Sequence, residues 1–150
     1  MSTWLLVADS SLGRLFKVDK EAKKLIEVEE LLNSEGRLQD KEFYSDSPGR
    51  AYDSGGMGRH LIEEGKKKKQ RSREQFAHEL AMCLRKIIFA EKVNHVFIVA
   101  PSKMLGCLGS EFDNLNCNCD VEKIAKELAS MSTSEIFDHL KKQLLVNKII

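Results

Sequence analysis

The sequence predicts an α/β protein in which helices flank a mixed sheet. Two observations lead to this class. The first third of the chain contains short apolar or alternating runs joined by tight polar turns, and the second half alternates amphipathic helical runs with a strongly apolar strand. A length of 150 residues, 42% of them hydrophobic, fits one domain over residues 1–150 with a sizeable core.

Three strands are expected before residue 33. Residues 3–8 form a continuous apolar run, residues 14–18 alternate, and residues 25–32 follow a charged turn. Their connections are too short for a crossover, so the strands should pair antiparallel as a β-meander.

A helix is expected to begin near residue 73 and to end around residues 91–92. Its apolar side chains recur at three- and four-residue spacing, which gives one buried stripe. The stripe consists of Phe76, Leu80, Cys83 or Leu84, Ile87 and Ile88. The next segment, residues 95–100, is apolar throughout, which is typical of a central strand buried on both faces.

Two more helices and one undecided element complete the chain. Pro101 suits the start of a helix, and Ser132 or Thr133 suits the N-cap of the last helix, with Glu135 in its first turn. The apolar faces of these two helices are Met104, Leu105, Leu108 and Phe112, and Ile136, Leu140, Leu144 and Leu145. Residues 121–128 have helical spacing, but a closing strand fits there too.

The resulting order predicts a ribonuclease-H-like mixed sheet: a β-meander followed by αβα units, flanked by helices. Between the two parts lies a long polar and basic loop, expected at about residues 33–72. Five glycines and one proline fall within residues 44–69, so this segment cannot bury much apolar surface. Long segments of this kind inside small domains are usually functional or disordered.

The charge of the chain is balanced overall, at +1, but uneven locally. From Arg59 to Arg73 there are seven basic residues and two acidic ones, which should attract anionic partners. The expected phosphate contacts are Arg50, Arg59, Lys66, Lys67, Lys68, Lys69, Arg71 and Arg73.

The loop also holds a dense polar cluster with two open interpretations. Arg50 and Arg59 could contact phosphate with His60 as a donor or acid/base group. Alternatively, Asp46 and Asp53 could bond nearby backbone amides in turns, with the arginines paired to them. The adjacent Gly55-Gly56 could let backbone approach a phosphate, although flexibility is the favoured interpretation.

No metal or cofactor is expected. Cys107, Cys117 and Cys119 lie in the same half of the chain as His95, but Cys-x-Cys without a second pair is not a zinc spacing. A nuclease would need further carboxylates near Asp9, and only Asp53 and Asp120 could be recruited. Unpaired thiols, no evident signal peptide and no long apolar run predict a cytoplasmic protein without a membrane partner.

The loop motif Asp46-x-Pro48-Gly49-Arg50-x-x-Asp53-Ser54-Gly55-Gly56-x-x-Arg59-His60 resembles the signature of the bacterial host attachment protein family. Other parts match in order: Thr3-Trp4-x-x-Val7-Ala8-Asp9, Phe76-Ala77-x-x-Leu80, Val99-Ala100-Pro101-x-x-x-Leu105-Gly106 and Glu135-Ile136-x-x-His139-Leu140. The resemblance therefore covers nearly the whole chain.

That family is considered a relative of the central domain of archaeal and eukaryotic peptide-chain release factors. The relation implies a ribonuclease-H-like layout and favours a strand near residues 119–126. In release factors a Gly-Gly-Gln tip precedes a long helix, and Gly55-Gly56-Met57 occupies a similar place here. A thioether cannot replace the amide that positions water near a peptidyl-tRNA ester. The expected activity is therefore binding of RNA or the ribosome, through tRNA or ribosomal RNA, without catalysis.

Two other functions stay open. One is a hydrolase acting on an ester or phosphodiester, with His60 and Asp53 as catalytic candidates. The other is a protein that interacts with host cells, as the name of the family implies.

Overall fold

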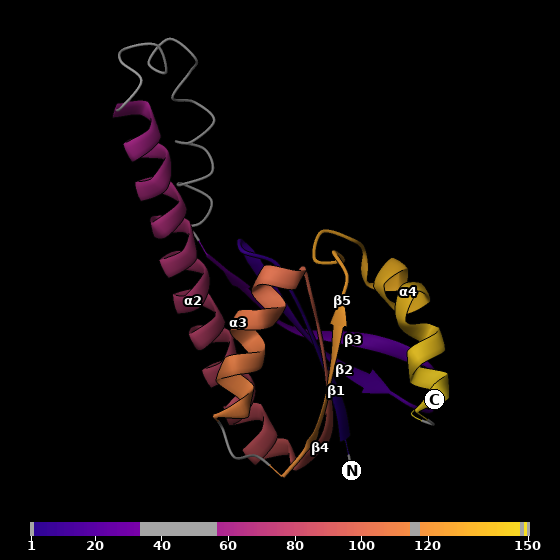
Figure 1. Cartoon of the computed structure of the whole chain (residues 1–150). Helices are drawn as coiled ribbons and strands as arrows, with labels where there is room; N and C mark the ends of the chain where they lie inside the picture. Colours follow the sequence, from indigo (N-terminus) through magenta and orange to yellow (C-terminus); the bar gives the residue numbers. More distant parts are fainter. Residues whose placement is uncertain (1, 34–56, 115–117, 148, 150) are drawn as a thin grey trace.

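The protein has one five-stranded mixed sheet with helices on both faces (Figure 1). The computed structural model describes residues 2–33, 57–114, 118–147 and 149. The strands, in chain order, are β1 Ser2–Ala8, β2 Leu12–Asp19, β3 Lys24–Leu32, β4 Val93–Ala100 and β5 Asp120–Ala125. The helices are α2 Met57–Glu91, α3 Ser102–Asp113 and α4 Thr133–Val146. The predicted fold class is confirmed.

The first three strands form the expected antiparallel meander. The turn between β1 and β2 is short because one carboxylate closes it. Asp9 Oδ1 accepts hydrogen bonds from the backbone N–H groups of Ser11 and Leu12, both at 2.8 Å. Such Asx turns satisfy donors that a tight turn would otherwise leave unpaired.

The sheet order is β3-β2-β1-β4-β5, and β4 pairs in parallel with both β1 and β5. The prediction of a strand buried on both faces is therefore confirmed for residues 96–100 of β4, which lies inside the sheet next to the central strand β1. The undecided segment contains a strand. Its side chains alternate between the two faces: Val121 packs against the cluster under α2 and α3, and Ile124 packs against the cluster under α4.

Two cores lie on opposite faces of the sheet. On one face, Leu6, Leu15 and Ile98 pack under α2 and α3, and all three are fully buried. On the other face, Val7, Phe16 and Val99 pack under α4. Ser132 provides the N-cap of α4, and its Oγ accepts from the N–H of Glu135. Leu145 was expected in the buried stripe of α4 but is half exposed, because that stripe follows the three- and four-residue spacing to Leu144.

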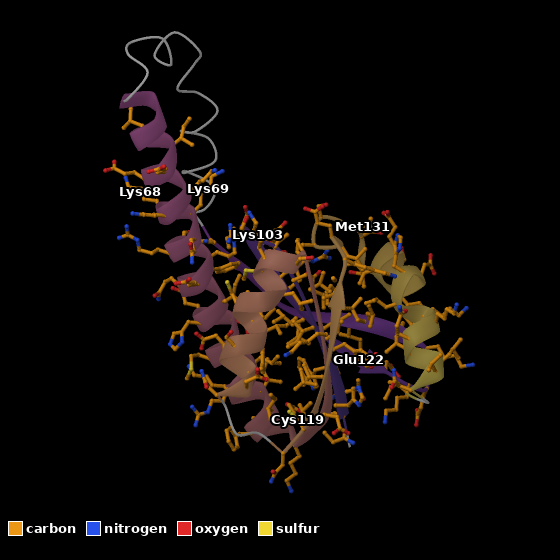
Figure 2. The ribbon with its side chains drawn as sticks, in the orientation of Figure 1. Lys68, Lys69, Lys103, Cys119, Glu122 and Met131 are labelled. Carbon is orange, nitrogen blue, oxygen red and sulfur yellow. The ribbon has the colours of Figure 1, made fainter. Side chains whose placement is uncertain are left out.

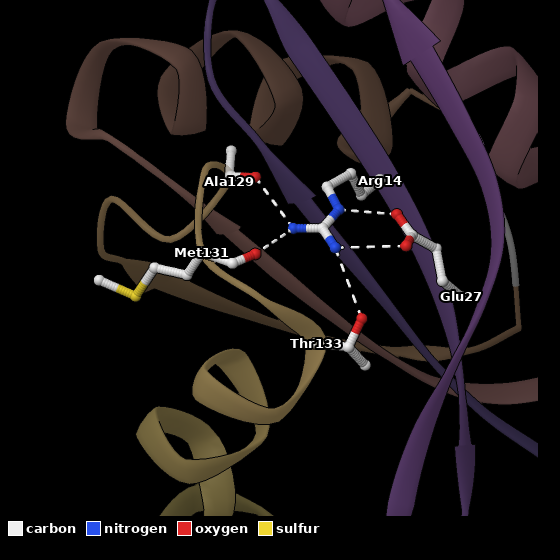
Figure 3. A network of polar contacts seen from close by, with 5 residues as sticks. All are labelled: Arg14, Glu27, Ala129, Met131 and Thr133. Carbon is white, nitrogen blue, oxygen red and sulfur yellow. Dashed lines mark hydrogen bonds and ion pairs between the residues drawn. The ribbon is translucent and has the colours of Figure 1, made fainter.

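A buried arginine joins the meander to the segment that leads into α4 (Figure 3). Arg14 is only 9% exposed. Its guanidinium donates to Glu27 twice, at 2.7 and 3.2 Å, and to the backbone carbonyls of Ala129 and Met131 and the hydroxyl of Thr133. The strand pattern alone did not reveal this network, because the acceptors on Ala129, Met131 and Thr133 lie more than 100 residues away in the chain.

No helix in the described part of the chain is both long enough and apolar enough to cross a membrane.

Candidate nucleic-acid interface

The predicted loop at 33–72 is wrong in its second part, because α2 already begins at Met57. Residues 57–72 continue the helix that was expected to start near residue 73. Two physical reasons explain the longer helix. Leu, Glu, Lys, Gln and Arg all have high helix propensity, and Glu63 and Glu64 stand four residues before Lys67 and Lys68, a spacing that stabilises helices. In the sequence pattern, the glycines and the run of lysines favoured a loop despite these helix-stabilising features.

With 35 residues, α2 is about 52 Å long. Its two parts differ in surroundings. Residues 74–91, the packed half, lie along the sheet and α3, whereas residues 57–73, which we call the arm, extend beyond the body of the protein (Figure 1). The base of the arm is tied to the sheet. The side chain of Asn33, after β3, donates to Ser72 Oγ and to the carbonyl of Ser10, both at 3.0 Å.

Six of the eight predicted phosphate contacts lie at residues 66–73 of the arm, a stretch that contains no acidic residue. Three are exposed (Lys66, Lys67 and Lys68), Arg71 is exposed as well, and Lys69 and Arg73 are partly buried. Figure 2 shows Lys68 and Lys69 on the arm, outside the body. Their assignment to phosphate binding stays a prediction.

The other predicted site residues are not placed. Arg50 and the loop signature residues Asp46, Pro48, Gly49, Asp53, Ser54, Gly55 and Gly56 lie outside the described residues. Arg59 and His60 belong to the first turn of α2, where only the backbone is described. The two catalytic candidates, Asp53 and His60, therefore stay predictions without a geometry.

The carboxylates considered for a nuclease do not meet. Asp9 follows the C-terminal end of β1, and Asp120 opens β5. Because β1, β4 and β5 all run in the same direction, these two residues lie at opposite ends of the sheet. A shared metal site between them is excluded.

One cysteine and one histidine of the packed half have local partners. Cys83 Sγ donates to Glu29 Oε2 at 3.2 Å, and burial together with this bond raises the thiol pKa to about 11. His78, on the packed half of α2, contacts Glu111 of α3 at 3.0 Å. Among the described residues no group of three His, Cys, Asp or Glu side chains could hold a metal ion, and Cys117 lies outside them.

A hollow of about 480 Å³ lies between α2 and α3 at the base of the arm. Its lining combines basic, acidic and neutral polar groups. The residues are Gln70, Arg73, Glu74, Lys103, Gly106, Cys107, Ser110 and Glu111. Lys103 did not stand out in the sequence, because an isolated lysine in a helix carries no pattern.

Comparisons with known proteins gave one matching family and several weakly similar solved structures, two of which are described here. The protein family described as "Protein required for attachment to host cells" matches residues 4–140. No curated protein matches the chain. The type II variant of the Aquifex aeolicus Ppx/GppA phosphatase is 17% identical over 83% of the chain, with a TM-score of 0.40. Another structure of the Aquifex aeolicus Ppx/GppA family member is 16% identical over 85%, with a TM-score of 0.37. The chain spans 36% of the length of each. Similarity at this level says nothing about activity.

Proposed function

The chain belongs to the family of proteins required for attachment to host cells, and we propose that it acts by binding structured RNA through the arm of α2. The family description suggests a role in attachment. The RNA proposal is more specific than that description: it names tRNA or ribosomal RNA as the partner and the cytoplasm as the location.

The observation that carries the proposal is the basic stretch at residues 66–73. It has six positive side chains and no negative one, and it lies on a helix that extends beyond the hydrophobic core. A dense positive field on a projecting element fits the phosphate backbone of a nucleic acid, whose binding is dominated by such charges. Neutralising several phosphates makes affinity strongly dependent on salt.

The proposed relation to the central domain of release factors supports RNA as the polyanion. In that comparison the arm corresponds to the long helix after the Gly-Gly-Gln tip. Met57 stands where the glutamine would be, so the proposed activity is docking without ester hydrolysis.

The test is a binding titration with labelled tRNA and with ribosomes at several salt concentrations. Reversing Lys66, Lys67, Lys68 and Lys69 to Glu should abolish binding at moderate salt. A matched variant reverses four exposed lysines elsewhere, Lys20, Lys24, Lys141 and Lys142, and should retain most of the affinity. Unchanged RNA binding after reversal of residues 66–69 would refute the proposal.

A second candidate, supported by the family match, is direct interaction with the surface of a host cell. Fractionation of producing cells separates the two functions. Protein found at the cell surface or outside the cell, and binding host cells when purified, would favour attachment over RNA binding.

A hydrolase is the third possibility, and the same purified protein tests it. Turnover of peptidyl-tRNA or of a generic phosphodiester, lost in His60→Ala, would assign catalysis to the region around residue 60. RNA binding without turnover agrees with the docking proposal.

A further inference from the structure

The basic residues of the arm divide into two sets by helix geometry. The buried stripe of the packed half consists of Phe76, Ala77, Leu80, Ala81, Leu84 and Ile88. Continued towards the N-terminus with the same three- and four-residue spacing, this stripe passes through Arg73, Lys69 and Lys66. These three, the inner set, lie on the side of α2 that faces the core farther along. Lys67, Lys68 and Arg71, the outer set, lie on the other sides of the helix.

Burial agrees with this division for two of the three inner residues, since Lys66 is exposed. Lys69 and Arg73 of the inner set are partly buried, whereas all three residues of the outer set are exposed. The arm thus turns a partly covered basic face towards the body, at the level where the hydrophobic core has ended.

That basic face ends at the hollow between α2 and α3. Arg73 lines the hollow from α2, and Lys103 lines it from the first turn of α3. Figure 2 shows Lys103 at the end of α3 that lies near the place where the arm leaves the body. Cations from two elements, separated by 30 positions in sequence, therefore border one concave corner.

Two carboxylates also line the hollow, but both have other partners. Glu74 Oε1 accepts from Gln70 Nε2 at 3.1 Å, and Glu111 Oε2 contacts His78 Nδ1 at 3.0 Å. Charges of both signs reach into the hollow. Burial raises the pKa of the Cys107 thiol, Arg73 opposes that rise, and Glu74 and Glu111 add to it.

We propose that Lys66, Lys69 and Arg73 of α2 together with Lys103 of α3 form the seat for the RNA backbone, with one phosphodiester held in the corner between the helices. The outer set then contributes only a general positive field. Arg73 can donate two parallel hydrogen bonds to one phosphate, which a lysine cannot. The hollow, about 480 Å³, lies within the range of small-ligand pockets, so it has room for one backbone unit. This inference rests on the proposed RNA binding.

The experiment compares two triple variants that remove the same charge. The inner variant is Lys66→Gln, Lys69→Gln and Arg73→Gln, and the outer variant is Lys67→Gln, Lys68→Gln and Arg71→Gln. We expect the inner variant to bind tRNA roughly tenfold more weakly, with the slope of log K against log salt smaller by about two to three. The outer variant should change affinity by about twofold or less.

A second set of variants tests Lys103, the α3 residue that only the fold brings to the corner. Lys103→Gln should reduce the salt slope by about one, while Lys142→Gln, an exposed lysine on α4, should leave it unchanged. Arg73→Lys keeps the charge and should lose affinity if paired hydrogen bonding to phosphate matters. Thermal unfolding of every variant shows that each compared protein is folded.

The outcomes separate the two proposals. Equal losses in the inner and outer variants, or no effect of Lys103→Gln, would overturn the corner and leave RNA binding by the arm in place. Wild-type binding in both triple variants would overturn RNA binding by the arm and the corner with it.

Discussion

The two halves of α2 share one hydrogen-bonded helix but are held in place by different forces. In the packed half, Phe76, Leu80 and Leu84 are almost fully buried against the sheet. In the arm, Leu61 is 64% exposed and Ile62 is 48% exposed, and lysines occupy the positions that the stripe would need. The packed half is therefore stabilised by tertiary contacts, whereas the arm depends on intrinsic helix propensity and on continuity with the packed half. A helix can thus serve as core at one end and as a charged projection at the other.

The sharpest test replaces one leucine in each half. Leu80→Ala should lower the free energy of unfolding by about 3 kcal/mol, because it opens a cavity in a fully buried site. Leu61→Ala should change it by about 0.5 kcal/mol or less, since most of that side chain already contacts water. Urea denaturation measures both. Similar losses would mean that the arm is packed as tightly as the rest of α2.

Cations offer the same comparison between the body and the arm. Arg14→Met should destabilise by about 2 kcal/mol, since it leaves Glu27 and two backbone carbonyls without their donor. Lys68→Met, on the exposed arm, should stay within about 0.5 kcal/mol. Chemical denaturation measures the free energy of unfolding of both variants. An Arg14→Met protein as stable as wild type would show that packing alone positions α4.

Breaking the helix separates the arm from the fold. Lys68→Pro should unwind the arm yet reduce global stability by less than about 1 kcal/mol, because residues 61–67 bury little surface. The same change at Ala81, which is fully buried, should cost about 3 kcal/mol or more. Circular dichroism reports the lost helix and thermal unfolding reports the stability. If the arm binds RNA as proposed, Lys68→Pro should also weaken tRNA binding while the fold persists.

The smallest effect concerns a thiol of the packed half. Burial and the bond to Glu29 raise the pKa of Cys83 from an ordinary 9.0 to about 11 in the folded protein. Since the folded state holds this proton more tightly, the associated stability is complete below pH 9 and is lost as pH rises towards 11. Between these values wild type should lose stability relative to Cys83→Ala. Parallel pH curves for the two proteins would contradict the assignment.

Much of the fold was predictable because local patterns and tertiary packing agree. The apolar run in residues 95–100 became the interior strand β4, and Ser132 caps α4 as its sequence context predicts. Residues 121–128 were not predictable from spacing, because Val121 and Ile124 fit both a helix face and two opposite strand faces. Pairing with β4 makes residues 120–125 a strand.

The candidate site divides in the same way. The basic stretch at residues 66–73 is a sequence property, since charge density does not depend on the fold. The sequence pattern favoured a loop over residues 57–72, because glycines and lysines predict poor burial. A helix does not need burial there, however, because helix propensity and the adjacent packed half stabilise its hydrogen bonds.

The sequence by itself determined the sheet class, the meander and the presence of a strongly positive segment, because these follow from local periodicity and charge. Only the tertiary structure decided which side of that segment faces the body. The packed half orients α2 through its buried stripe, and this rotation places Arg73 beside Lys103 at one hollow. Helix periodicity puts Lys66 and Lys69 on the same side of α2 as Arg73. No local pattern contains that rotation, because it depends on how α2 and α3 pack against the same sheet.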